Sequence, residues 1–240
     1  HSHLSTEGGG AGGSVYINAT NVTGSGLITV SGGRATETND GGGGGGRIAI
    51  HYQTNNFEGY INASGGGTTA TANMETTGGA GTIYMKSSTQ EFGNLILDNK
   101  GTVRRFSVRS PTILNSSVLS LSNLDNLTVV NSSDLQLEIP LTINNTKFVI
   151  GVNSTFRQWA DFHAPRLDNF TIYGEFDLTA NYSFNDTMVL TLVGANVTHK
   201  GEDSVQRYIV NITAGNITVD STSRIDVRGR GYQRNTGPGL

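Results

Sequence analysis

The stretch GGRIAIHYQTNNFEGYINASGG (Gly45–Gly66) decides the fold, because two other segments repeat its layout. It reads as a glycine-rich start, a short apolar strand, a polar turn, a glycine, a second short strand and a glycine-rich end. The other copies are GGSVYINATNVTGSGLITVSGG (Gly12–Gly33) and GAGTIYMKSSTQEFGNLILDNKG (Gly79–Gly101). The glycines that precede the first strand of each copy are 33 and then 35 residues apart. Repetition at a nearly fixed period is the signature of a repeat architecture.

Apolar and polar residues alternate along the first strand of each copy, as Ile48 and Ile50 do in the middle one. A period of two indicates a half-buried β-strand rather than a helix. Residues that favour helices are sparse, whereas Thr, Val, Ile, Asn and Gly are abundant. Equivalent strands at a constant spacing can bury their apolar side chains by stacking. The sequence therefore predicts an all-β fold of the right-handed parallel β-helix (β-solenoid) type, although sandwiches and barrels also contain regular short strands.

The repeats divide the chain into two predicted parts. We call one turn of the solenoid a rung. Residues 1–101 hold the three glycine-rich copies. Residues 102–240 hold less regular rungs and end in a glycine-rich, repeat-like segment. In the second part LDNLTVVNSSDLQL, from Leu124, matches LDNFTIYGEFDLTA, from Leu167, at a spacing of 43 residues. We expect a change of cross-section within Thr102–Pro111 and a strand-rich insertion around Phe156–Pro165.

Six consecutive glycines, Gly41–Gly46, stand directly before a strand in NDGGGGGGRIAIHY. A dinucleotide-binding glycine loop is followed by a helix, and a phosphate-binding loop ends in Lys-Ser/Thr where Arg47-Ile48 stands here. Calcium-binding β-roll repeats carry a recurring aspartate, but Asp40 is the only acid beside the run. Shorter glycine runs precede the same strand in the other copies. We therefore expect a corner between rungs, where glycines allow close packing and positive φ.

Charge and hydropathy exclude two kinds of partner. The net charge is −3, and no basic stripe suggests nucleic acid. No apolar run approaches the ~18–20 residues that cross a bilayer, so we predict no membrane-spanning segment. The sequence begins at His1 rather than Met, and we interpret it as a processed or excised piece of a longer protein.

Asparagine sequons are the strongest functional signal. The chain has no cysteine, and it holds 14 Asn-X-Ser/Thr sequons where its composition would give about 5 by chance. We predict N-glycosylation at Asn18, Asn21, Asn62, Asn115, Asn126, Asn131, Asn144, Asn153, Asn169, Asn181, Asn185, Asn196, Asn211 and Asn216. The alternative is that Asn and Thr are simply common at the turns and edges of β-rich proteins. Dense sequons favour an extracellular protein, which without disulfides must be held together by β hydrogen bonding.

Motifs for catalysis or metal binding are weak. His1-Ser2-His3 would bind Cu(II) only if His1 were a free N-terminus, and His51 and His199 have no partner at ligand spacing. No Gly-x-Ser-x-Gly elbow occurs, and without cysteine there is no thiol nucleophile. We predict no catalytic residue, no metal site and no cofactor.

A sugar-active site is a further possibility to weigh, because β-helices often host polysaccharide lyases and glycosidases. Glycoside hydrolysis requires two carboxylates across a groove. Acidic residues and aromatic residues do gather in the second part, namely Asp161, Asp168, Glu175 and Asp177 with Trp159, Phe162 and His163. No Asp-Asp pair and no Asn-Thr-Asp motif of the pectinase kind occurs. We interpret these residues as solvated turn positions and a core or corner aromatic.

The segments GGSVYINATNVTGSGLITVSGG, GGGGGGRIAIHY, GGAGTIYMK with GNLILDN, and GNITVDSTSRIDVRGRGY resemble the glycine-rich β-helical repeats of very large secreted or cell-surface proteins of archaea and bacteria. The resemblance covers about residues 8–101 and 214–240, and the sequon density makes it more similar to archaeal cell-surface glycoproteins. It implies a structural or adhesive surface role. It carries over no catalytic residue, because none matches.

These observations predict a structural glycoprotein at the cell surface, a building block of an extracellular filament, sheath or stalk. Its expected partners are other copies of itself, in a homopolymer or tandem array, and covalent N-glycans. Because GRGYQRNTGPGL at the end would lead into HSHLSTEGGGAGGSVYI at the start, end-to-end association is expected. Two alternatives remain: a carbohydrate-binding or adhesion module that uses the Trp159–Tyr173 region, and a β-helical polysaccharide-active enzyme.

Overall fold

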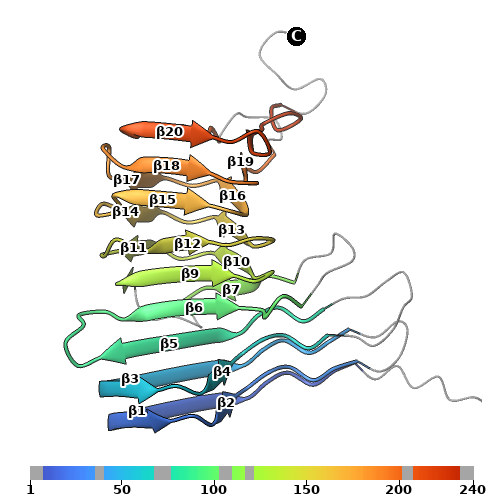
Figure 1. Cartoon of the computed structure of the whole chain (residues 1–240). Helices are drawn as coiled ribbons and strands as arrows, with labels where there is room; N and C mark the ends of the chain where they lie inside the picture. Colours follow the sequence, from blue (N-terminus) through green and yellow to red (C-terminus); the bar gives the residue numbers. More distant parts are fainter. Residues whose placement is uncertain are drawn as a thin grey trace, which may run out of the picture. The chain divides into compact units, whose positions relative to one another are not determined.

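All regular secondary structure in the described part of the chain is β-strand. The computed structural model describes residues 8–35, 41–67, 77–102, 110–116, 122–201 and 208–232. Within these ranges the elements are strands and no helix occurs (Figure 1), so none of these residues forms an apolar helix that could cross a membrane. The chain divides into two compact units. Unit 1 is His1–Thr112 with Leu127–Asp134, and unit 2 is Ile113–Asn126 with Leu135–Leu240.

Unit 1 is built from long strands. They are β1 (Ser14–Gly24), β2 (Leu27–Thr29), β3 (Arg47–Phe57), β4 (Tyr60–Asn62), β5 (Thr82–Ser87), β6 (Asn94–Asp98) and most of β9 (Asn126–Val130). The order β1-β3-β5-β6-β9 forms one sheet, and β2 pairs with β4. Val15 lies opposite Ile48, which lies opposite Ile83, so the ladder follows the sequence repeats of 33 and 35 residues. These pairs are parallel, as the repeats predict.

The third copy departs from the other two, because its second strand folds back on its first. Strands β5 and β6 pair antiparallel within one sheet, with Met85 opposite Asn94, whereas β2 and β4 pair with each other in a separate sheet that packs against the core of β1 and β3. The expectation of three equivalent copies is wrong here, and length gives the reason. Strand β5 has 6 residues where β3 has 11. After it Gln90 N–H donates to the Ser87 carbonyl, and Gly93 adopts a φ of 107°, so the chain reverses in a hairpin.

The glycine runs of unit 1 form a bundle of extended segments held by backbone hydrogen bonds. Gly9 N–H donates to the Gly41 carbonyl, Gly43 N–H to that of Gly33, and Gly45 N–H to that of Gly79. Each segment therefore bonds to neighbours in more than one direction, unlike a strand in a flat sheet. Such bonding needs backbones close enough that side chains are excluded.

Contacts along Gly41–Gly46 repeat every three residues. A Cβ on Gly43 would lie 2.0 Å from the Gly10 carbonyl oxygen, and one on Gly46 would lie 1.9 Å from that of Gly13. A Cβ on Gly42 or Gly45 would meet the carbonyl oxygens of a second segment, also at 1.9 Å. A Cβ on Gly44 would meet nothing within 4 Å. A period of three is that of the polyproline II type of helix, and only glycine fits its two packed faces.

No glycine of Gly41–Gly46 uses the positive φ that glycine allows. The described glycines with positive φ are Gly24, Gly93, Gly101, Gly194 and Gly229, and none lies in Gly41–Gly46. The expected close packing is correct, but it occurs in an extended bundle. The residues that join successive segments, 36–40 and 68–76, lie outside the described residues.

Unit 2 is built from short strands with a shorter repeat. Its strands are β7 (Thr112–Leu114), β8 (Asn123–Leu124), β10 (Asp134–Leu137), β11 (Leu141–Ile143), β12 (Phe148–Ile150), β13 (Thr155–Gln158), β14 (Phe162–Ala164), β15 (Asn169–Ile172), β16 (Glu175–Leu178), β17 (Tyr182–Phe184), β18 (Val189–Leu192), β19 (Asn196–Thr198), β20 (Asn216–Val219) and β21 (Arg224–Ile225). They stack in three series, β12-β15-β18-β20, β7-β10-β13-β16-β19-β21 and β8-β11-β14-β17. Neighbouring strands such as β15 and β18, β13 and β16, and β14 and β17 run parallel, which gives a solenoid-like arrangement.

The 43-residue spacing seen in the sequence spans two rungs of unit 2. Thr155 pairs with Glu175, and Glu175 with Asn196, so these two rungs take 20 and 21 residues, and the last described rung, from Val189 to Asn216, takes 27. The segment Phe156–Pro165 is consequently no insertion. It carries β13 and β14, which pair with strands of the neighbouring rungs. The expected change at Thr102–Pro111 falls mostly on residues 103–109, outside the described residues.

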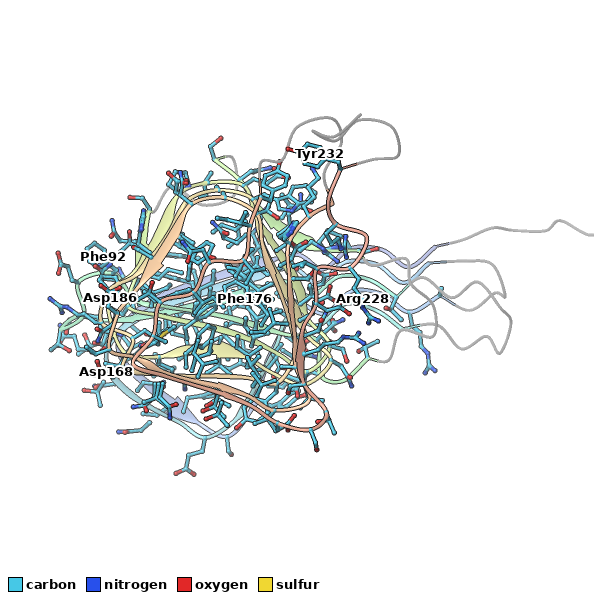
Figure 2. All side chains as sticks on the ribbon, turned by 90° about the horizontal axis from the view of Figure 1, so that it is seen from above. Phe92, Asp168, Phe176, Asp186, Arg228 and Tyr232 are labelled. Carbon is cyan, nitrogen blue, oxygen red and sulfur yellow. The ribbon has the colours of Figure 1, made fainter. Side chains whose placement is uncertain are left out.

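A cluster of phenylalanines fills the interior of unit 2, with Phe176 among them (Figure 2). Phe148 lies between 4.7 and 6.1 Å, centroid to centroid, from four other rings. The rings come from all three stacks of strands, because Phe148 and Phe170 lie in one stack, Phe156 and Phe176 in a second and Phe162 in the third. Interlocking aromatic rings in edge and stacked geometries contribute beyond the apolar area that they bury.

A polar side chain at the edge of this core is fully satisfied. The Gln158 side chain is inaccessible to solvent, at the end of β13. Its amide NH₂ donates to the carbonyls of Ala160 and Asn181, at 2.7 and 2.8 Å, and its oxygen accepts from the backbone of Thr179 and Ala180. Gln158 therefore ties the turn after β13 to the turn after β16 in the next rung.

Candidate functional site

The fourteen sequon asparagines all lie among the described residues, and none of them is buried. The exposed ones are Asn18, Asn21, Asn131, Asn153, Asn169, Asn181, Asn211 and Asn216, and the half-buried ones are Asn62, Asn115, Asn126, Asn144, Asn185 and Asn196. The contrast is Asn99, which is in no sequon and is buried. Its side-chain oxygen accepts a hydrogen bond of 2.7 Å from Gly65 N–H.

Strand alternation explains how sequons can occur within a core-forming strand. In Asn169-Phe170-Thr171 the asparagine is exposed and Phe170 is buried. The two ends of the motif are two residues apart and share the outer face, while the middle residue points into the core. Asn169 and Asn216 also share one row, with Val189 between them in register. Their backbones are thus two strand spacings apart, ~9–10 Å.

Several sequon amides already make hydrogen bonds through Nδ2. Asn131 donates to Asp98, Asn144 to Asn123 and Asn185 to Asp168, at 2.8–3.0 Å. An amide NH₂ has two hydrogens, so the single contacts of Asn131 and Asn185 each leave one for substitution by a sugar. Asn144 Nδ2 also lies within 3.5 Å of the Leu124 and Thr142 carbonyls, so a sugar there would replace one of these contacts. Burial raises the pKa of Asp98, but the hydrogen bonds from Lys100 and Asn131 outweigh it and hold this pKa below the ordinary value.

Trp159 and Tyr173 do not form one binding surface. Trp159 directly follows β13, and Tyr173 precedes β16, the strand that pairs with β13. They therefore stand at opposite ends of a strand pair, about six residues or ~20 Å of extended chain apart. Trp159 is 40% exposed, and Lys200 Nζ lies over its ring at 4.9 Å from the centroid.

The four acidic residues considered for a glycosidase do not form a pair of carboxylates across a groove. Asp161 and Asp168 are in the connections before β14 and β15, and Asp168 accepts from Asn185. Glu175 and Asp177 share the outer face of β16, two residues apart. Glycoside hydrolysis needs carboxylates that face each other across a groove, and these two are neighbours on one strand.

Asp177 should make stability depend on pH. Burial raises the pKa of its carboxyl above the ordinary value, although Thr179 donates to it and Arg230 and Arg157 are near. The folded state thus holds this proton more tightly than the unfolded state, and stability falls as pH rises through the folded pKa.

The substitution Asp177→Asn creates a sequon with Thr179, so the chain is made in a host that adds no N-glycans. We expect Asp177→Asn to have a higher Tm than the wild type at pH 7, and expect this difference to close as the pH falls below about 3.9, the ordinary pKa of aspartate. Thermal unfolding followed by circular dichroism across this range measures it. Asp186→Asn, at an exposed turn, is the control and should leave Tm unchanged. A lower Tm for Asp177→Asn at pH 7 would contradict the assignment.

Metal binding was the remaining candidate chemistry, and several of its residues lie outside the described part of the chain. His1, Ser2, His3 and Asp40 lie outside the described residues. Within the described ranges no three His, Asp or Glu side chains gather as metal ligands. His199 bonds through Nδ1 to the Lys200 carbonyl, at 2.6 Å.

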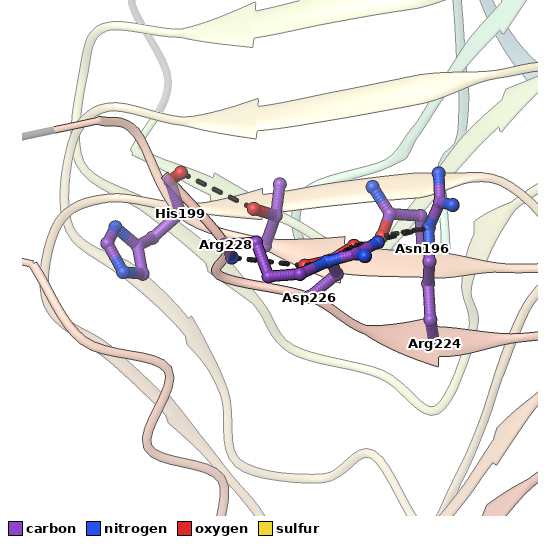
Figure 3. Close-up of polar contacts among 6 residues, drawn as sticks. Asn196, His199, Arg224, Asp226 and Arg228 are labelled. Carbon is purple, nitrogen blue, oxygen red and sulfur yellow. Dashed lines mark hydrogen bonds and ion pairs between the residues drawn. The ribbon is translucent and has the colours of Figure 1, made fainter. Parts of the chain in front are cut away.

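Charged side chains gather on and just after β21, the last described strand of unit 2 (Figure 3). Arg228 binds Asp226 through two guanidinium nitrogens, Nε at 3.0 Å and Nη2 at 2.6 Å, and Arg224 Nε donates to the Asn196 side chain at 3.1 Å. The Arg228 hydrogen bonds lower the pKa of the Asp226 carboxyl. The two arginine side chains are solvent-exposed and Asp226 is half-buried, so the contribution of these contacts to stability is small.

A groove on the outer face of unit 1 was not predicted from the sequence. It has a volume of about 450 Å³ and is lined by Asn18, Ala19, Thr20, His51, Tyr52, Gln53, Lys86, Ser87 and Ser88. Asn18, His51 and Lys86 form one row across β1, β3 and β5. The His51 ring lies between those of Tyr16 and Tyr84, at 5.4 and 5.7 Å. The sequence repeats could have indicated the groove, because they align the three strands that form it. The sequence analysis treated His51 only as a possible metal ligand.

Comparison with known proteins assigns no family and no function to this chain. No family model matches the chain, and neither a curated protein nor a solved structure matches it. The functional proposal consequently rests on the residues and contacts described above.

Proposed function

We propose that this chain is a structural glycoprotein of the cell surface, a building block of an extracellular filament, sheath or stalk. In this proposal a right-handed parallel β-helix carries the load and N-glycans coat it. The observation that carries the proposal is the placement of the sequons: fourteen asparagines, none of them buried, on a scaffold whose cores are filled by other, apolar side chains. Such a pattern suits a surface that is modified densely without loss of packing.

The backbone supports a mechanical role. Parallel ladders and the glycine bundle satisfy backbone groups of one rung with those of the next, so stability accrues from neighbours. Cysteine is absent, and stacked hydrogen bonds take the place of disulfide links. This construction suits an elongated secreted protein.

The last described rung of unit 2 supports self-association, into a homopolymer or a tandem array. Ile217 and Val219 of β20 lie in register with Leu190 and Leu192, which are buried, yet they are 41% and 45% exposed. Ile225 of β21 is likewise exposed, although its partner Val197 is buried. In a solenoid these positions are covered by another rung, and open ends invite pairing with a further chain.

The sequence of this rung points to the kind of rung that would cover it. RIDVRGRG (Arg224–Gly231) repeats the layout of LITVSGGR (Leu27–Arg34) and YINASGGG (Tyr60–Gly67). In unit 1 the strands of these two segments, β2 and β4, pair in parallel with each other. A glycine-type rung from another copy is therefore the partner that the proposal assigns to β21.

Electron microscopy of the purified, concentrated chain tests the proposal, and we expect filaments or sheets that repeat this unit. Ile217→Asp with Val219→Asp should disperse them, because two charges would be buried in the contact. Ser221→Asp, an exposed turn residue beside the same strand, is the control and should leave assembly intact. Monomers at all concentrations, for the wild type and for both variants, would argue against self-association.

A further inference from the structure

We propose that the groove on the outer face of β1, β3 and β5 seats the chain's own glycan at Asn18, so that the first sugars pack against the protein. This inference rests on the proposed function, since it requires that Asn18 is glycosylated. It adds a defined sugar site to a surface that would otherwise only carry glycans.

The sequon itself forms part of the groove. Asn18 and Thr20, the two defining residues of Asn18-Ala19-Thr20, both line it. Asn18 is exposed and stands in register with His51 on the next strand. A sugar bonded to Asn18 Nδ2 therefore starts inside the groove and has its walls within reach.

The lining suits a sugar on both of its chemical faces. A pyranose ring has an apolar face of C–H groups and a rim of hydroxyl and amide groups. The imidazole of His51, held between Tyr16 and Tyr84, offers a ring surface to the apolar face. Gln53 and Ser88 offer hydrogen-bond donors and acceptors to the rim.

Size and neighbouring sequons support the same interpretation. The groove, of about 450 Å³, lies within the range of ~300–1,000 Å³ that small-molecule sites occupy. Asn21 follows three residues later on the same strand and is exposed, yet it does not line the groove. Asn21 is therefore a matched control within one strand, because a glycan there would start outside the lining of the groove.

Secretion of the full chain from a yeast host, which links its glycans through N-acetylglucosamine, tests the proposal. We expect glycopeptide mass spectrometry to find Asn18 occupied. Asn18→Gln should lower Tm by about 2–4 °C, whereas Asn21→Gln should leave it within about 1 °C. Trimming the glycans enzymatically to the first sugar should preserve most of the stabilisation, because that sugar lies in the groove.

A double-mutant comparison shows whether the sugar acts through the groove. His51→Ala should lower Tm in the glycosylated chain and change it less in the Asn18→Gln background. Equal effects in both backgrounds, equal effects of the two asparagine variants, or a bare Asn18 beside other occupied sequons would overturn the groove proposal and leave the glycoprotein proposal standing. A chain without glycan at any sequon would overturn both.

Discussion

Gly43→Ala is expected to lower the free energy of unfolding by at least about 3 kcal/mol, the upper end of what overpacking usually costs. Its Cβ would lie 2.0 Å from the Gly10 carbonyl oxygen and 2.7 Å from that of Gly9. Both obstacles are backbone atoms of a hydrogen-bonded segment, so no rotamer change relieves them. The predicted fall in Tm is about 6–12 °C for a chain of this size, measured by circular dichroism or calorimetry.

Gly44→Ala, the neighbouring substitution in the same run, is the control and should behave in the opposite way. A Cβ there meets nothing within 4 Å, and Gly44 has no positive φ. Alanine lowers the entropy of the unfolded chain, so stability should be unchanged or rise by about 0.4–1 kcal/mol. Equal tolerance of alanine at both positions would show that the run is a linker and not a packed bundle.

Phe148→Ala is expected to cost about 3–5 kcal/mol, as truncation of a buried aromatic usually does. The ring contacts Phe156, Phe162, Phe170 and Phe176, so its removal leaves a cavity between all three stacks of unit 2. Urea unfolding should show a lower midpoint with a similar slope, because the same surface is exposed on unfolding.

Tyr173→Ala removes another aromatic ring of unit 2, and it is the matched control. Tyr173 is 39% exposed in the connection between β15 and β16. We expect a loss well below that of Phe148→Ala, within about 1 kcal/mol. If the two variants lost the same stability, the phenylalanine cluster would not be the centre of the core.

Much of the fold was predictable where the sequence repeats itself. The 33-residue copies predict Ile48 opposite Val15, because parallel stacking brings equivalent residues together, and the two residues do pair. The three-faced rungs of unit 2 were harder to see. Phe148, Phe170 and Leu190 stand at equivalent positions of successive rungs but share little beyond being apolar, and the match at 43 residues hid the spacing of a single rung.

Two features depended on contacts that a sequence pattern does not contain. The reversal after β5 follows from the shortness of that strand, since the third copy otherwise carries the same glycines. The glycine run was expected as a corner that allows positive φ. Its true arrangement, with Gly43 and Gly46 against one segment and Gly42 and Gly45 against another, depends on segments that are distant along the chain.

The sugar-related sites show the same division. Sequon positions follow directly from the sequence. Strand alternation explains how an asparagine such as Asn169 avoids burial within a strand, and half of the sequon asparagines lie in turns and connections instead. The Asn18 groove requires β1, β3 and β5 side by side, because Lys86 is far from Asn18 along the chain. Trp159 is the single tryptophan of the chain, but its place in the fold separates it from Tyr173.

Intact mass before and after enzymatic removal of N-glycans is the most direct test of the proposed function. The chain from a glycosylating host should be heavier than its 25.4 kDa polypeptide and return close to that mass on treatment. Glycopeptides should then map the sugars to several of the fourteen sequons, on unit 1 and on unit 2. A mass that equals the bare polypeptide from the start would contradict the glycoprotein account and the extracellular location inferred from it.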